Sequence, residues 1–124
     1  MAHILVIDDS ADLVEILREV LSLEHEVTTA ETGREGIATA QRVNPDVVIL
    51  DMQLPEMNGI EVGLEIKRSV SDVRILVLTA LAQSEDEETV LASGCCDAYL
   101  PKPATLDAIR DQVAELLERG ANAR

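Results

Sequence analysis

Aromatic side chains are almost missing from this chain of 124 residues, which has one tyrosine and no phenylalanine or tryptophan. Hydrophobic residues still make up 47% of the sequence, so the composition is that of a globular protein rather than a disordered one. The length indicates one domain, long enough to bury a core without disulfides. That core must be aliphatic, and Tyr99 stands out as the only aromatic side chain.

Positive charge is also scarce, with 10 Lys and Arg against 24 Asp and Glu and a formal net charge of −14. Such an acidic chain is repelled by nucleic acid and by anionic membranes, so we expect neither as a partner. Its negative charge is compatible with binding a divalent cation or a basic patch on another protein. No apolar run approaches the roughly 18 residues of a membrane span and no signal peptide begins the chain, which predicts a cytoplasmic location.

Cysteine is limited to the adjacent pair Cys95 and Cys96. A disulfide between neighbouring residues is badly strained, and two thiols without other soft ligands do not form a zinc site. We therefore expect both cysteines to be small buried residues with free thiols, in a reducing compartment.

Short apolar runs that end in polar residues are the most distinctive feature that the sequence does have. Runs of this kind, aliphatic and often β-branched, are typical of strands buried on both faces of a sheet. The runs and the polar residues that follow them are Ile4–Ile7 with Asp8 and Asp9, Val47–Leu50 with Asp51, Ile75–Leu78 with Thr79, and Ala98–Leu100 with Lys102. Because parallel strands end at the same edge of a sheet, these polar side chains are predicted to converge where such sheets bind their ligands.

Helical patterns alternate with the strand patterns along the chain. Strands are predicted at 3–8, 27–30, 46–51, 74–79 and 96–100. Helices are predicted at 11–22, from the cap Thr32 to Val43, from Ile60 to Val70, from the capping box Ser84–Glu87 to a C-cap at Gly94, and from Thr105 to about residue 120. This alternation predicts an α/β protein with a doubly wound parallel sheet. Residues 1–120 are the one predicted domain, and 121–124 are a C-terminal tail.

Three carboxylates at one edge, Asp8, Asp9 and Asp51, repel one another, and a hard divalent cation such as Mg²⁺ relieves that repulsion. An aspartate beside Mg²⁺ is able to attack phosphorus and form an acyl phosphate. The Lys102 ammonium is able to supply positive charge to the oxygens of a phosphoryl group, and the Thr79 hydroxyl is able to donate a hydrogen bond to one of them. Each residue alone has a plainer interpretation: a helix cap with a solvated charge for Asp8 and Asp9, a surface charge for Lys102 and local capping for Thr79. Their joint placement at four strand ends favours the phosphoryl interpretation.

Four motifs carry a resemblance to a known family. They are Val-Ile-Asp-Asp at 6–9, Val-Ile-Leu-Asp-Met-Gln-Leu-Pro-Glu-Met-Asn-Gly at 48–59, Leu-Thr-Ala at 78–80 and Tyr-Leu-Pro-Lys-Pro at 99–103. In this order they resemble the receiver domain of bacterial two-component response regulators, over the full length of the chain and in the stand-alone, single-domain form. The resemblance implies a flavodoxin-like fold of five parallel strands in the order 2-1-3-4-5 with five helices.

The resemblance also assigns roles at the carboxyl edge. Asp51 matches the phosphoacceptor, and Thr79 and Lys102 match the residues that contact the phosphoryl group. The implied cofactor is Mg²⁺. Its implied ligands are Asp9 directly, Asp8 through water, Asp51, and the backbone carbonyl of Gln53.

A switch and a set of partners are implied as well. Thr79 and Tyr99 match the pair that moves on phosphorylation, and the Lys102–Pro103 peptide bond is expected to be cis. The phosphoryl group is expected to come from a phosphohistidine on a sensor histidine kinase or a histidine phosphotransfer protein. Its loss by slow hydrolysis means that no multiple-turnover enzyme is expected. Output to a downstream protein is expected through the face of the fourth helix, fifth strand and last helix.

Other functions and one irregularity stay open. A small Mg²⁺-dependent phosphohydrolase with an aspartyl nucleophile is the main alternative, although such enzymes usually have a second Asp where this chain has Gln53. The chain is also compatible with a receiver cut from a larger response regulator or hybrid kinase, or with a degenerate receiver that serves only as a binding module.

The segment Gly94–Tyr99 is one residue longer than is usual in the family, which predicts either a different cap at Gly94 or a bulge at the start of the fifth strand.

Overall fold

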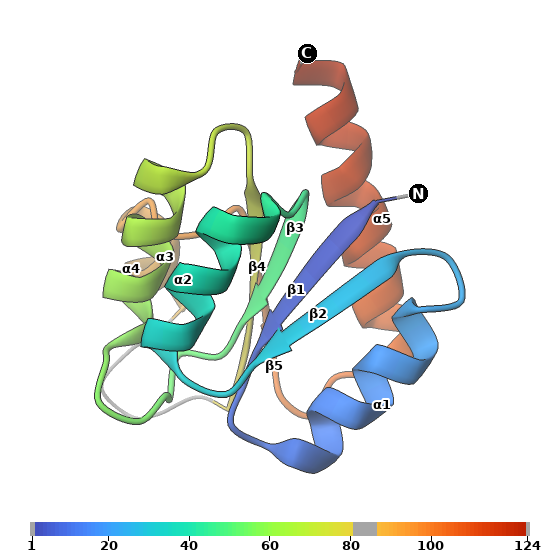
Figure 1. Cartoon of the computed structure of the whole chain (residues 1–124), viewed down its shortest axis with the longest axis horizontal. Helices are drawn as coiled ribbons and strands as arrows, with labels where there is room; N and C mark the ends of the chain where they lie inside the picture. Colours follow the sequence, from blue (N-terminus) through green and yellow to red (C-terminus); the bar gives the residue numbers. More distant parts are fainter. Residues whose placement is uncertain (1, 81–86, 124) are drawn as a thin grey trace.

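The computed structural model describes residues 2–80 and 87–123, and within them five strands alternate with five helices (Figure 1). In chain order they are β1 (His3–Ile7), α1 (Ala11–Leu21), β2 (Glu26–Ala30), α2 (Gly33–Val43), β3 (Val47–Leu50), α3 (Gly59–Ser69), β4 (Arg74–Thr79), α4 (Glu87–Ala92), β5 (Ala98–Pro101) and α5 (Leu106–Ala123). The alternation and the α/β class are confirmed.

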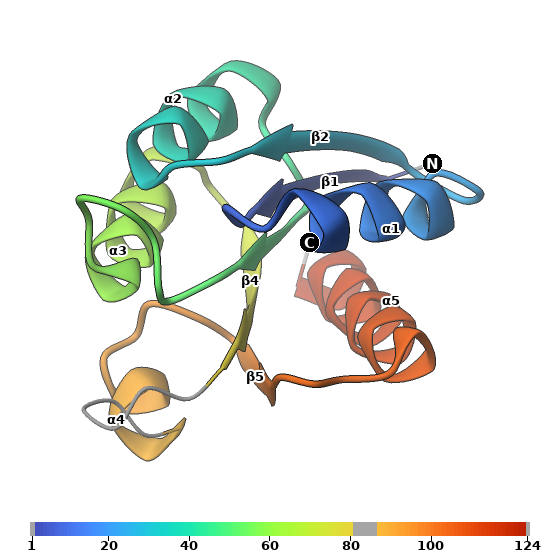
Figure 2. The same cartoon turned by 90° about the horizontal axis from the view of Figure 1, so that it is seen from below.

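The five strands form one parallel sheet in the order β2-β1-β3-β4-β5. This is the order that the family resemblance implies. All strands run the same way, so their carboxyl ends meet at the edge that faces the viewer in Figure 2. The site residues predicted from the sequence follow β1, β3, β4 and β5, and the strand order therefore brings them to this edge.

Helices cover both faces of the sheet, with α1 and α5 on one side and α2, α3 and α4 on the other (Figure 2). Strand β3 shows how the sequence produces two cores: Val47 and Ile49 pack toward α1 and α5, whereas Val48 and Leu50 pack toward α2 and α3. Side chains of a strand alternate between its faces, so a strand covered on both faces is apolar throughout. The core is aliphatic, as the composition requires.

Helix α2 begins and ends where its capping residues predict. The Glu35 backbone N–H donates to Thr32 Oγ1 at 3.1 Å, and the Glu35 carboxylate accepts from the Glu31 backbone N–H at 2.7 Å. Asn44 closes the helix in the left-handed conformation, with φ of 51°. The second predicted capping box, Ser84–Glu87, begins outside the described residues, and α4 is described from Glu87.

The segment between α4 and β5, predicted to be one residue longer than usual, forms a turn before a regular strand. Gly94 has φ of 81° and its N–H donates to the Leu91 carbonyl at 3.3 Å, a left-handed helix end that glycine adopts without strain. Strand β5 then pairs with β4 in regular register. Gly94 thus caps α4 in the left-handed conformation, and the predicted bulge is wrong. The strand begins at Ala98 rather than at residue 96 because the turn takes up both cysteines.

Both cysteines are buried free thiols, as predicted. A hydrogen bond with the Cys95 thiol, together with burial, raises the pKa of Cys96 and keeps it protonated. Helix α3 packs closely here: a Cβ added to Gly63 would lie 2.5 Å from the Cys95 carbonyl oxygen. The turn is therefore a tightly packed part of the core.

Helix α5 is longer than predicted. It continues to Ala123, past the end expected near Gly120. One glycine lowers helix stability by only about 1 kcal/mol, and the alanines at 121 and 123 favour the helix, so the glycine does not end it. Among the described residues, no helix combines the length and apolar character needed to cross a membrane.

Candidate functional site

Three acidic side chains meet at the carboxyl edge of the sheet because two neighbouring strands end there. Asp51 follows β3 and its N–H donates to the Ile7 carbonyl of β1 at 3.0 Å, whereas Asp8 and Asp9 follow β1 itself. One carboxylate oxygen from each of the three lies within 4.8 Å of the others. Asp8 and Asp51 are buried, with 3% and 5% of their surface exposed, and Asp9 is exposed. The predicted convergence is thus observed.

The Asp51 carboxylate has different neighbours at its two oxygens. Oδ1 accepts from the Thr79 hydroxyl at 2.9 Å and from the Gln53 backbone N–H at 3.1 Å. Oδ2 lies 3.6 Å from the Lys102 ammonium. Burial raises the pKa of Asp51 above its ordinary value, with a further increase from the charge of Asp8; the two hydrogen bonds and Lys102 oppose this increase. Burial of the carboxylate is therefore the main cause of the increase.

Lys102 lies closer to Asp8 than to Asp51. Its Nζ donates to Asp8 Oδ2 at 2.9 Å, so one ammonium bridges the two buried carboxylates. The backbone holds this lysine in place: its N–H donates to the Thr79 carbonyl at 2.9 Å, and its peptide bond to Pro103 is cis, as predicted.

Two backbone contacts of the site were not predicted from the sequence. The Ser10 N–H donates to Asp8 Oδ1 at 2.8 Å, as the Gln53 N–H does to Asp51. In both, the donor is two residues after an aspartate, the arrangement of an Asx turn, and that spacing is the signal that could have revealed them. Gln53 was expected to contribute its carbonyl to a metal; what the structure describes is its N–H on Asp51 and an isolated bridge to Asn58.

Tyr99 is placed in β5 opposite Val77 of β4. It is partly buried and packs against the core on the α2 and α3 side of the sheet. Thr79, at the end of β4, is buried and directed at Asp51. The two residues predicted to form a switch therefore lie on adjacent strands, one at the acidic site and one facing the α4 side.

The three clustered carboxylates fit a hard divalent cation by their chemistry. They offer oxygen ligands only, they bring three negative charges to within 4.8 Å, and one positive charge, Lys102, partly balances them.

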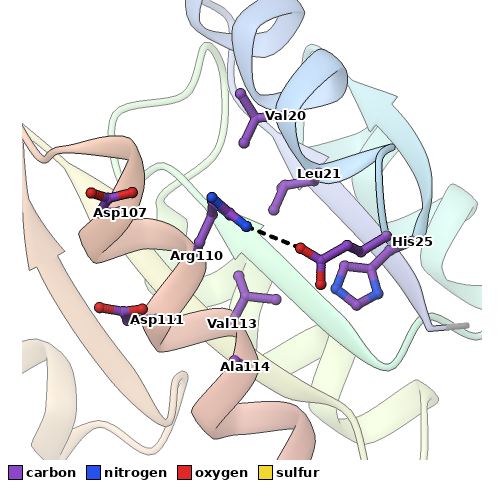
Figure 3. Close-up of a pocket in the computed structure, with 9 residues that line it drawn as sticks. Val20, Leu21, His25, Asp107, Arg110, Asp111, Val113 and Ala114 are labelled. Atoms are coloured by element: carbon purple, nitrogen blue, oxygen red, sulfur yellow. Dashed lines mark hydrogen bonds and ion pairs between the residues drawn. The ribbon is translucent and has the colours of Figure 1, made fainter.

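A hollow of about 240 Å³ lies away from this site, between α1 and α5, where Arg110 donates a hydrogen bond to the Glu24 carboxylate at 3.0 Å (Figure 3). None of the predicted site residues lines that hollow.

Comparison with known proteins decides what this site belongs to. The family model of the response regulator receiver domain matches residues 4–114. The chain belongs to the response-regulator receiver domain family. It is therefore a receiver domain of the two-component type, a phosphoryl-accepting fold, and Asp8, Asp9 and Asp51 form its acidic cluster.

Individual relatives agree with this assignment. The response regulator SaeR of Staphylococcus aureus is 33% identical over 120 residues, which are 96% of this chain and 52% of SaeR. The chain thus spans about half the length of the curated relatives it matches. The response regulator TrrA of Thermotoga maritima, solved in complex with Mg²⁺–BeF, is 35% identical with a TM-score of 0.81, covering 94% of this chain and 99% of that one. A CheY-like receiver domain protein of Methanospirillum hungatei shares the fold, with a TM-score of 0.93 at 24% identity over 100% of this chain and 99% of that one.

Membership of the family has three general consequences. Receiver domains bind Mg²⁺ at an acidic cluster of this kind, and receiver domains of response regulators are phosphorylated by sensor kinases. They are generally not multiple-turnover enzymes.

Proposed function

We propose that Asp51 is the residue of this receiver that accepts the phosphoryl group, from a phosphohistidine on a sensor histidine kinase or a histidine phosphotransfer protein. One observation carries the proposal: Asp51 is a buried carboxylate at a strand end that faces two further acids, an ammonium and a hydroxyl. No other acidic side chain among residues 2–80 and 87–119 shares that combination.

The contacts of the carboxylate suggest which oxygen reacts. Oδ1 already accepts two hydrogen bonds, from Thr79 and Gln53, whereas Oδ2 lies 3.6 Å from the Lys102 ammonium. Oδ2 is therefore proposed to bond to phosphorus. Lys102 then contacts a phosphoryl oxygen, and the Thr79 hydroxyl turns from Asp51 to another. Little covalent chemistry is required, because phosphoryl transfer depends mainly on positioning and charge neutralisation.

The residues proposed to hold Mg²⁺ are Asp9 directly, Asp8 through water, Asp51, and the Gln53 carbonyl. When bound, the ion supplies positive charge that offsets both the acidic cluster and the phosphoryl oxygens. The clustering of three carboxylate oxygens within 4.8 Å supports this proposal, because it brings negative charge together at the place where a cation is needed.

The proposed output surface is the α4–β5–α5 face. Movement of the Thr79 hydroxyl toward the phosphoryl group is proposed to make room for Tyr99 to pack further inward, since the two lie on adjacent strands. Leu91 on α4 and Leu106 on α5 are large apolar side chains exposed by 38% and 37%, and they suit contact with a downstream protein.

Slow loss of the phosphoryl group, rather than enzymatic turnover, is proposed because of Gln53. An aspartyl phosphohydrolase needs a general acid two residues after its nucleophile, and the exposed amide of Gln53 does not supply a proton in that way.

A cytoplasmic location is proposed for the protein, because neither cysteine is in a disulfide and such thiols are typical of a reducing compartment.

The experiment is intact-mass spectrometry after incubation with acetyl phosphate, with Mg²⁺ or with EDTA. We expect one added phosphoryl group on the wild type with Mg²⁺, removed by hydroxylamine, and none on Asp51→Asn. Asp72→Asn is the matched control, because Asp72 is exposed, lies before β4 and has a positive φ that asparagine tolerates. Full labelling of Asp51→Asn would refute the assignment, and multiple turnover on phosphomonoesters would favour the hydrolase.

A further inference from the structure

An apolar cavity lies beside the acidic site. Its volume is about 450 Å³, and its lining comes from α1, the end of β4, the β5–α5 turn and α5. Leu13, Leu78 and Ile109 provide aliphatic walls, of which Leu78 and Ile109 are almost wholly buried. The volume is within the range of small-molecule sites, roughly 300–1,000 Å³.

Two small residues at the border leave this space open. Ala80 is exposed directly after β4, and Ala104 is partly buried in the turn before α5; both line the cavity. The chain has no phenylalanine or tryptophan that could fill a volume of this size. An apolar group that enters such a cavity leaves water for an aliphatic surface, which is favourable.

Lys102 joins the cavity to the acidic site. Among the described residues it is the only charged one in the lining, and its Nζ lies 3.6 Å from Asp51 Oδ2. On the other side, Ala80 directly follows Thr79, whose hydroxyl donates to Asp51. Lys102 and Ala80 therefore lie at the boundary between the acidic site and the cavity.

We propose that this cavity binds the apolar acyl group of a small acyl phosphate, and so selects such molecules as phosphodonors for Asp51. The proposal rests on the function proposed above. In the reaction, Asp51 Oδ2 forms a bond to phosphorus while the bond from phosphorus to the acyl oxygen breaks. The electron pair leaves with that oxygen as a free carboxylate, and no proton is transferred. A phenyl or branched aliphatic acyl group fills the cavity, whereas the methyl group of acetyl phosphate is too small.

The test compares benzoyl phosphate with acetyl phosphate, by intact mass, in the presence of Mg²⁺. The quantity measured is the ratio of the two second-order rate constants, which removes differences in chemical reactivity when variants are compared. Ala104→Phe fills the cavity, Ala104→Leu fills part of it, and Ala38→Phe adds the same ring at an exposed position on α2 as the control.

We expect Ala104→Phe to lower the benzoyl-to-acetyl ratio by at least about tenfold, because one misfit methylene in an apolar pocket changes a rate by about that factor or more. Ala104→Leu is expected to lower it less, and Ala38→Phe to leave it at the wild-type value. Labelling by acetyl phosphate shows that each variant is folded and competent. A ratio unchanged by Ala104→Phe would overturn the acyl-site proposal while leaving Asp51 as the acceptor. Failure of both donors to label the wild type would overturn the proposed function and this inference together.

Discussion

Replacing the proposed phosphoacceptor by its amide should stabilise the metal-free protein. In Asp51→Asn the side chain keeps its shape, and its oxygen is still able to accept from Thr79 and Gln53. What the substitution removes is a negative charge that is 5% exposed and lies beside two others. The free energy of unfolding is therefore expected to rise, although the variant loses its proposed function.

The distances give the size of the effect. At 4.8 Å, the largest separation in the acidic cluster, two unit charges repel by about 3.5 kcal/mol when the effective dielectric constant is about 20. At 3.6 Å, the Lys102 ammonium attracts Asp51 by about 4.6 kcal/mol on the same basis. Two repulsions exceed this one attraction, and solvent screens the contribution of the exposed Asp9. We expect a gain of about 1 to 2 kcal/mol for Asp51→Asn.

Urea denaturation at neutral pH measures this difference. In EDTA, the midpoint of Asp51→Asn should lie above that of the wild type with an unchanged dependence on urea, and Asp72→Asn should match the wild type. Saturating Mg²⁺ should reduce the difference, because the ion stabilises whichever protein binds it more tightly and the wild type has the extra carboxylate. A variant that is less stable than the wild type in EDTA would refute the view that the buried Asp51 charge destabilises the metal-free site.

Two further substitutions test other parts of the structure. Gly63→Ala places a Cβ 2.5 Å from the Cys95 carbonyl oxygen. Overpacking of this kind costs about 1–3 kcal/mol, which exceeds the gain of about 1 kcal/mol in helix propensity, so the urea midpoint is expected to fall. An equal or higher midpoint would contradict the close packing of α3 against the Cys95 turn. Lys102→Met keeps the apolar stem and removes the ammonium that lies between Asp8 and Asp51. The rate of labelling by acetyl phosphate should fall by about 100-fold, because the positive charge at the phosphoryl group is lost. A wild-type rate would exclude Lys102 from the phosphoryl site.

The sequence was sufficient for most of the site because strand ends and residue types coincide. Four apolar runs identified four of the five strands, and parallel strands have their carboxyl ends at one edge, so Asp8, Asp51, Thr79 and Lys102 had to come together. Their individual roles, in contrast, came from the family resemblance. Composition and spacing alone do not distinguish a phosphoacceptor from a metal ligand.

Other features depend on three-dimensional packing and were not predictable from local patterns. The closer approach of Lys102 to Asp8 than to Asp51 depends on how the β5–α5 turn crosses the sheet edge. The regular pairing of β5 follows the left-handed turn at Gly94. The apolar cavity at Ala104 arises where three aliphatic walls from separate elements meet two alanines, and no single segment of the sequence contains it.

The most direct test of the central claim locates the phosphoryl group on the chain. After incubation with acetyl phosphate and Mg²⁺, borohydride reduces an aspartyl acyl phosphate to homoserine, and peptide mass spectrometry identifies the converted position. Asp51 is predicted to be the only residue converted, and only when Mg²⁺ is present. Conversion at Asp8 or Asp9, or a phosphoryl group retained on His3 or His25, would contradict the account.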